Sequence, residues 1–149
     1  MSSLTYIFLS SNNLSGAIPA QIGNMSSLKN LFLSSNNLSG AIPAQIGNLS
    51  SLAYLRLDYN NLSGSIPSVI GNLSSLTNLW LSSNNLSGPI PAALENLNSL
   101  QYLYLDYNPS LVCWQTEAAL TWALSLRDVG NYRGPEVVCP CVHLPLVIR

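Results

Sequence analysis

The chain has 149 residues, which is enough for one domain of ordinary size. Hydrophobic residues make up 48% of it and can form a core, whereas Asp, Glu, Lys and Arg together make up only 7%. A formal net charge of -1 and only five cationic residues exclude the basic surface that nucleic-acid binding requires. No apolar run is long enough to span a bilayer, so we expect no membrane segment in this chain.

A repeat of 24 residues fills most of the chain. Residues 2–25 and 26–49 are identical at 20 of 24 positions, and residues 50–73 and 74–97 follow the same pattern. A fifth copy begins at residue 98 and then diverges. One such unit cannot bury its apolar edge alone, so the repeats must stack and each repeat position becomes a column. We predict a solenoid over residues 2–112, followed by a C-terminal cap and tail over residues 113–149.

Each copy combines a short apolar strand with a turn. In the first copy, Leu4, Ile7 and Leu9 have the spacing of a strand with one apolar face, and Gly16 and Pro19 predict a bend after it.

An asparagine recurs three residues after the last strand leucine. Its amide both donates and accepts hydrogen bonds, so we predict that it satisfies backbone groups in its own coil and in the neighbouring one. This predicted ladder is Asn12, Asn36, Asn60, Asn84 and Asn108.

The full repeat, L-x-x-L-x-L-x-x-N-x-L-S-G-x-I-P-x-x-I-G-N-L, resembles that of plant-type leucine-rich repeat proteins. These include ectodomains of receptor-like kinases and cell-wall inhibitor proteins. The resemblance implies an α/β-type solenoid, a right-handed superhelix with a concave parallel sheet and an outer side of short extended or 3₁₀ segments. It also implies a protein that binds rather than catalyses, lies outside the cell or at its surface, and needs no cofactor.

The chain changes character after the fifth copy begins. Ala119, Trp122, Ala123 and Leu126 follow helical spacing, and Thr116 can cap the start of that helix. We expect this helix to cover the last coil, because an open coil exposes its apolar cross-section.

The three cysteines, Cys113, Cys139 and Cys141, all lie in this segment. Their arrangement around an apolar helix resembles the cysteine-bearing C-terminal cap of extracellular leucine-rich repeat proteins, which implies one disulfide from Cys113 to Cys139 or Cys141. Zinc binding with His143 as a fourth ligand is disfavoured because only one residue separates Cys139 from Cys141. We therefore predict no metal.

At the other end, the chain enters its first repeat without a polar cap or a signal segment. This is expected of a fragment or a processed chain, and the uncovered first coil is a candidate site of self-association.

The strand positions that point away from the core vary, whereas the framework barely changes. One of these columns holds four aromatic residues and one arginine, and strands about 4.8 Å apart would join them into a stripe. Aromatic residues and arginine are enriched at binding hot spots. We predict a protein- or peptide-binding surface on the concave sheet, formed by Tyr6, Phe8, Phe32, Tyr54, Arg56, Asp58, Tyr59, Trp80, Tyr102, Tyr104, Asp106 and Tyr107.

Two other functions stay open. Regular Ser and Asn columns could bind ice or a cell-wall polysaccharide, although the varied aromatic column is not the uniform array that a lattice binder needs. The chain could also be a scaffold without a ligand, because aromatic residues suit a pleated surface for structural reasons alone.

We predict no enzymatic activity. The chain has a single histidine and no nucleophile or nucleotide-binding motif. Asp58 and Asp106 are two repeats apart, roughly 10 Å, which is a loose pair for a hydrolase.

Seven N-x-Ser sequons fit a secreted glycoprotein, although Asn-Leu-Ser is also part of the repeat itself. The possible glycosylation sites are Asn13, Asn24, Asn37, Asn48, Asn61, Asn72 and Asn85.

Overall fold

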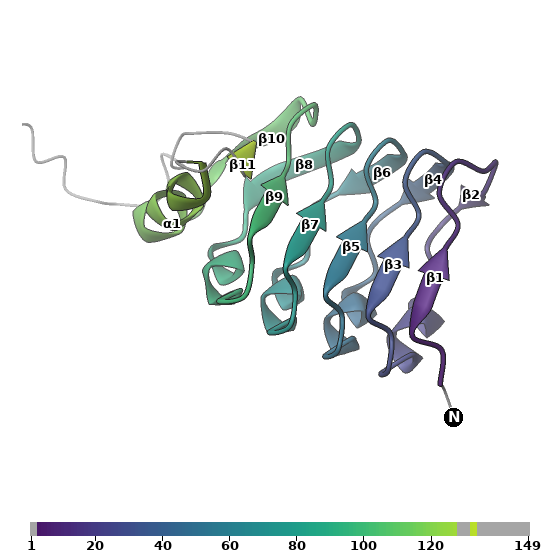
Figure 1. Ribbon diagram of the computed structural model, residues 1–149. Coiled ribbons are helices and arrows are strands. Elements are labelled where there is room, and N and C mark those ends of the chain that lie inside the picture. Colours follow the sequence, from purple (N-terminus) through teal and green to yellow (C-terminus); the bar gives the residue numbers. More distant parts are fainter. Residues whose placement is uncertain (1–2, 128–131, 134–149) are drawn as a thin grey trace, which may run out of the picture.

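The computed structural model describes residues 3–127 and 132–133, and it shows stacked coils that form two parallel sheets (Figure 1). Each repeat adds one strand to the first sheet, so strand order follows chain order and equivalent repeat positions pair. This six-stranded sheet consists of β1 (Tyr6–Phe8), β3 (Asn30–Phe32), β5 (Tyr54–Arg56), β7 (Asn78–Trp80), β9 (Tyr102–Tyr104) and β11 (Tyr132–Arg133).

The return half of each coil forms the second sheet and a row of short 3₁₀ helices. A proline at the N-cap holds the extended backbone that separates strand from helix, with ψ between 130° and 139°. The strands are β2 (Ser15–Gly16), β4 (Asn37–Gly40), β6 (Asn61–Gly64), β8 (Asn85–Ile90) and β10 (Ser110–Trp114). The 3₁₀ helices are η1 (Ala20–Asn24), η2 (Ala44–Asn48), η3 (Ser68–Asn72) and η4 (Ala92–Asn96). These elements confirm the predicted solenoid with extended and 3₁₀ segments on its outer side.

The core consists of leucine and isoleucine columns that run through the stack. The central strand leucines, such as Leu31 and Leu55, are fully buried between the two sheets. In the first coil the equivalent columns are open: Leu4, Leu9 and Leu14 are 48%, 43% and 38% exposed. No described coil covers this end, so these inward-facing side chains lie in contact with solvent.

The asparagine ladder has the predicted geometry. The Asn60 amide donates to the carbonyl oxygens of Leu57 in its own coil at 3.1 Å and of Leu33 in the preceding coil at 2.9 Å. Its Oδ1 accepts from the backbone N–H of Leu38 at 3.0 Å. Asn12 in the first coil is exposed and bonds only within its own coil.

Helix α1 (Glu117–Arg127) lies against η4 and β9 at the end of the stack, as the sequence predicted (Figure 1). The Thr116 hydroxyl accepts a hydrogen bond from the Ala119 N–H at 3.1 Å, which confirms the predicted N-cap. Ala119 and Ala123 are fully buried. The helix therefore covers the apolar cross-section of the last coil.

Two strands at this end lie across or beyond residue 112, the predicted end of the repeat array. Strand β11 pairs with β9 as a sixth strand, with Arg133 aligned with Tyr104. Strand β10 runs across the predicted boundary at residue 113 and extends the second sheet. Both additions pair backbone groups that the last full coil would otherwise leave at an open edge.

Cys113 is buried in β10 and is disulfide-bonded. Cys139, Cys141 and His143 lie outside the described residues, so the choice of partner stays a prediction.

No helix in the described ranges has the length and apolar character needed to cross a membrane. Within the same ranges, no three metal-binding side chains come together.

Candidate ligand-binding surface

One column of side chains forms a continuous row of contacts across five strands of the six-stranded sheet, from β1 to β9. The rings of Phe8 and Phe32 meet edge to face with centroids 5.0 Å apart, and those of Trp80 and Tyr104 with centroids 5.2 Å apart. The Arg56 guanidinium bridges the two pairs, 5.9 Å from the Phe32 ring and 3.9 Å from the Trp80 ring. We call these five residues the aromatic stripe.

The stripe follows from register and pleat. In-register parallel pairing places Phe32 beside Phe8 and Trp80 beside Arg56, and residues two apart on a strand share a face. Tyr6 therefore stacks beside Phe8 with centroids 6.0 Å apart, and Tyr54 reaches the Phe32 ring at 6.3 Å.

Tyr6, Phe8 and Tyr54 are exposed, whereas Tyr102 at the far end of the flanking column is half-buried. The predicted concave-face residues of the strands thus lie on one surface.

Asp58 differs from its predicted role as a ligand contact. Its side chain is only 4% exposed, and its carboxylate accepts two hydrogen bonds from Arg56, from Nε at 3.3 Å and from a terminal nitrogen at 3.2 Å. Asp58 is only two residues from Arg56, and both of its carboxylate oxygens accept from the guanidinium. Asp58 therefore orients the guanidinium over the Trp80 ring. An aspartate two residues after an arginine in the extended segment that ends β5 is the sequence signal for this pairing.

The turn after each strand contains a residue with left-handed backbone. Tyr59 and Tyr107 have φ of 54° and 55°, as do the serines at the same position in the other coils. The two tyrosine rings project into solvent and are 59% and 75% exposed. Both tyrosines are among the residues predicted from the sequence, whereas their left-handed conformation is not.

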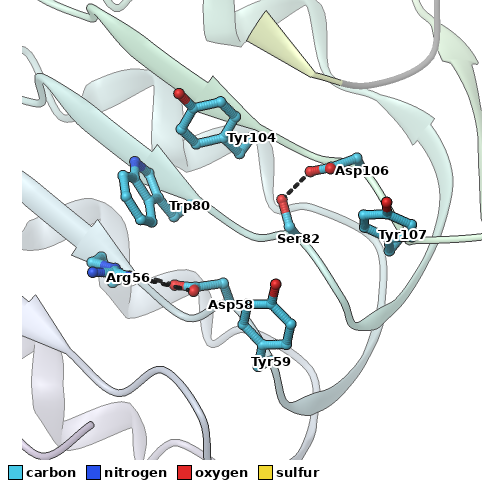
Figure 2. Close-up of a pocket in the computed structure, with 8 residues that line it drawn as sticks. All are labelled: Arg56, Asp58, Tyr59, Trp80, Ser82, Tyr104, Asp106 and Tyr107. Atoms are coloured by element: carbon cyan, nitrogen blue, oxygen red, sulfur yellow. Dashed lines mark hydrogen bonds and ion pairs between the residues drawn. The ribbon is translucent and has the colours of Figure 1, made fainter. Parts of the chain in front are cut away.

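Stripe and turn residues enclose a hollow of about 300 Å³ above coils three to five (Figure 2). At its floor, the Ser82 hydroxyl donates a hydrogen bond to Asp106 Oδ1. The Trp80 indole Nε1 is buried and has no acceptor within the described part of the chain. The lining residues are Arg56, Asp58, Tyr59, Trp80, Ser82, Tyr104, Asp106 and Tyr107.

A second opening lies at the uncovered first coil. It measures about 260 Å³ and is lined almost entirely by apolar side chains, including Leu9, Leu14 and Ile18. This is the predicted site of self-association, which stays a prediction.

The seven sequon asparagines are all exposed, and none belongs to a strand of the six-stranded sheet. They form two rows, one around the start of the second-sheet strands and one at the ends of η1, η2 and η3. Glycans at these positions would leave the aromatic stripe uncovered.

A family model described as a leucine-rich repeat region matches residues 1–128. The chain belongs to the leucine-rich repeat family. No curated protein matches this leucine-rich repeat chain.

Similar solved structures are ectodomains of plant receptors. The plant peptide hormone receptor RGFR1 in complex with RGF2 is 48% identical over 74% of this chain, with a TM-score of 0.73. The Arabidopsis receptor kinase HAESA ectodomain, solved with an N-terminal extended IDA peptide hormone, is 44% identical over 77%, with a TM-score of 0.66. The ectodomain of the Arabidopsis receptor kinase SOBIR1 is 35% identical over 74%, with a TM-score of 0.70.

The leucine-rich repeat chain spans 18% of the RGFR1 and HAESA chains and 59% of the SOBIR1 chain. The similarity therefore shows a plant-type leucine-rich repeat architecture like that of receptor ectodomains. It gives no support to binding of ice or a cell-wall polysaccharide.

Proposed function

We propose that this chain is an extracellular recognition module that binds a peptide or a protein segment across its six-stranded sheet. The observation that carries the proposal is the unbroken aromatic stripe, in which four rings and one guanidinium touch in sequence across five strands. Two of the similar structures are receptor complexes, the plant peptide hormone receptor RGFR1 with RGF2 and the HAESA ectodomain with an IDA peptide hormone.

The chemistry of the stripe suits this role. Aromatic side chains offer a large contact area and lose little conformational freedom on binding, and Arg56 is already held in place by Asp58. Such preorganised anchors are typical of the residues that dominate binding energy.

The test is a selection of displayed random peptides on the oxidised full chain, followed by calorimetry with the enriched peptides. Trp80→Ala removes the centre of the stripe. Val112→Ala is the matched control, because Val112 is 55% exposed on the second sheet. We expect Trp80→Ala to weaken binding by roughly 30-fold or more, as for a hot-spot residue, and Val112→Ala to leave it unchanged.

Equal affinities for the two variants would place binding elsewhere and overturn the proposal. Failure to enrich any peptide, with circular dichroism showing a folded chain, would instead favour the scaffold interpretation.

A further inference from the structure

Two tyrosines occupy a backbone position that disfavours them. Tyr59 and Tyr107 have left-handed φ angles, where the Cβ of an L-residue meets the backbone. The other three coils have Ser11, Ser35 and Ser83 at this position. The tyrosine rings gain little burial in return, since both are exposed. Stability therefore does not account for tyrosine at these two positions, and exposed aromatic side chains are enriched at binding sites.

The two rings border a slot that is one side chain wide. Tyr59 N–H bonds to the Ser82 carbonyl at 3.0 Å, and Ser83 N–H bonds to the Asp106 carbonyl at 3.0 Å, so the three coils are paired at this level. The tyrosines are then two strand spacings apart, about 9.6 Å. A flat side chain that contacts a ring on each side at about 3.5–4.0 Å needs about 7–8 Å, so this spacing admits one flat side chain with about 2 Å to spare and is too narrow for two.

At the floor of this slot lies the Asp106 carboxylate, which can accept further hydrogen bonds. Figure 2 shows the Ser82 hydroxyl directed at Asp106 and both tyrosine hydroxyls pointing the same way. Asp106 Oδ1 accepts from Ser82, while no described residue bonds to Oδ2 or forms an ion pair with Asp106.

The other charges of the hollow neutralise each other. Arg56 and Asp58 form a bidentate pair, and the guanidinium lies against the Trp80 ring. Among the described residues that line the hollow there is therefore one more carboxylate than cation, and aromatic residues lie beside Asp106.

We infer that this hollow is a socket for a basic side chain of the bound peptide, with arginine as its best occupant. The ligand guanidinium lies between Tyr59 and Tyr107 and donates to Asp106 Oδ2, which combines cation–π contacts with a charge-assisted hydrogen bond. A volume of about 300 Å³ is small for a whole ligand and suits one long side chain. The inference rests on the proposed function and adds the chemistry that the ligand must carry.

The test compares an enriched peptide that contains arginine with the same peptide carrying citrulline, its neutral isostere. Calorimetry is performed on the full chain and on Asp106→Ser, Tyr107→Ser and Val112→Ala. We expect the two serine variants to fold because serine occupies both positions in three of the other four coils. We expect citrulline to weaken binding to the wild-type chain by about tenfold or more. On Asp106→Ser the two peptides should bind nearly equally, whereas Val112→Ala should keep the full difference.

Several results would overturn the socket. The socket is wrong if the enriched peptides share no basic residue, or if the preference for arginine over citrulline survives Asp106→Ser. In either case the proposed function still holds as long as binding depends on Trp80. An enriched lysine in place of arginine, with the same dependence on Asp106, supports the socket and assigns it an ammonium group. If no peptide is enriched at all, the socket and the proposed function fall together.

Discussion

Asn60 shows how one amide can hold two coils together. It is buried and bonds to three backbone carbonyls and one backbone N–H. Asn60→Ala leaves these buried backbone groups without a hydrogen-bond partner, so we expect a loss of about 2–4 kcal/mol in the free energy of unfolding. Asn12→Ala is the internal control, because Asn12 is exposed and should cost less than about 1 kcal/mol. Urea denaturation of both variants checks the difference, and equal losses would contradict it.

The Arg56–Asp58 pair allows a prediction that uses the repeat itself. Arg56→Phe installs the aromatic residue of the first two coils but leaves the Asp58 carboxylate buried without a partner. We expect a destabilisation of about 2 kcal/mol, because an uncompensated buried charge is costly.

The double variant Arg56→Phe/Asp58→Ser removes that charge and returns both positions to residues found in other coils. Thermal denaturation should show it to be more stable than the single variant. If the double variant were no more stable than Arg56→Phe, the buried Asp58 carboxylate would not be the cause of the destabilisation.

At the scale of elements, α1 depends on its N-cap. Thr116→Ala removes the acceptor for the Ala119 N–H and should cost about 1 kcal/mol. Thr121→Ala makes the same chemical change at an exposed position inside α1, where alanine favours a helix, so it should be neutral or slightly stabilising. Denaturation midpoints of the two variants decide the matter, and a Thr121→Ala loss as large as that of Thr116→Ala would rule out the capping explanation.

The 3₁₀ helices stack closely enough to require glycine. A Cβ at Gly47 would lie 2.7 Å from the backbone oxygen of Val69 in the next coil. Gly47→Ala must therefore shift a backbone segment, and we expect it to cost about 3 kcal/mol.

Gly88→Ala serves as the comparison for that variant. Its Cβ would meet no atom within 4 Å, so its left-handed φ of 79° should cost only about 1 kcal/mol. Chemical denaturation that ranks Gly88→Ala as the more harmful change would contradict the close stacking of η2 and η3.

For the whole molecule, periodicity made the fold predictable from the sequence. A 24-residue repeat determines which positions share a column, so the Asn60 ladder and the aromatic stripe could both be predicted without coordinates. Strand β11 could not be predicted, because it pairs with β9 at the end of the sheet and its sequence does not follow the repeat.

The details of the candidate site were less predictable than its location. Asp58 has the same outward-facing repeat position as Asp106, yet Asp58 is buried under Arg56, whereas no described residue bonds to Asp106 Oδ2. The difference depends on the residue two positions earlier in the same coil, which is Arg56 in one case and Tyr104 in the other. The left-handed backbone of Tyr59 is set by the turn and its hydrogen bond to Ser82, which residue spacing does not reveal.

The most direct test of peptide recognition on the six-stranded sheet is an NMR titration of the three indole N–H signals with an enriched peptide. Trp80 lies on that sheet, whereas Trp114 and Trp122 pack together at the capped end with ring centroids 6.3 Å apart. Single Trp→Phe variants assign the signals. We predict that the Trp80 signal shifts saturably while those of Trp114 and Trp122 stay in place. Shifts confined to Trp114 or Trp122, or saturable binding that moves none of the three, would contradict recognition on the aromatic stripe.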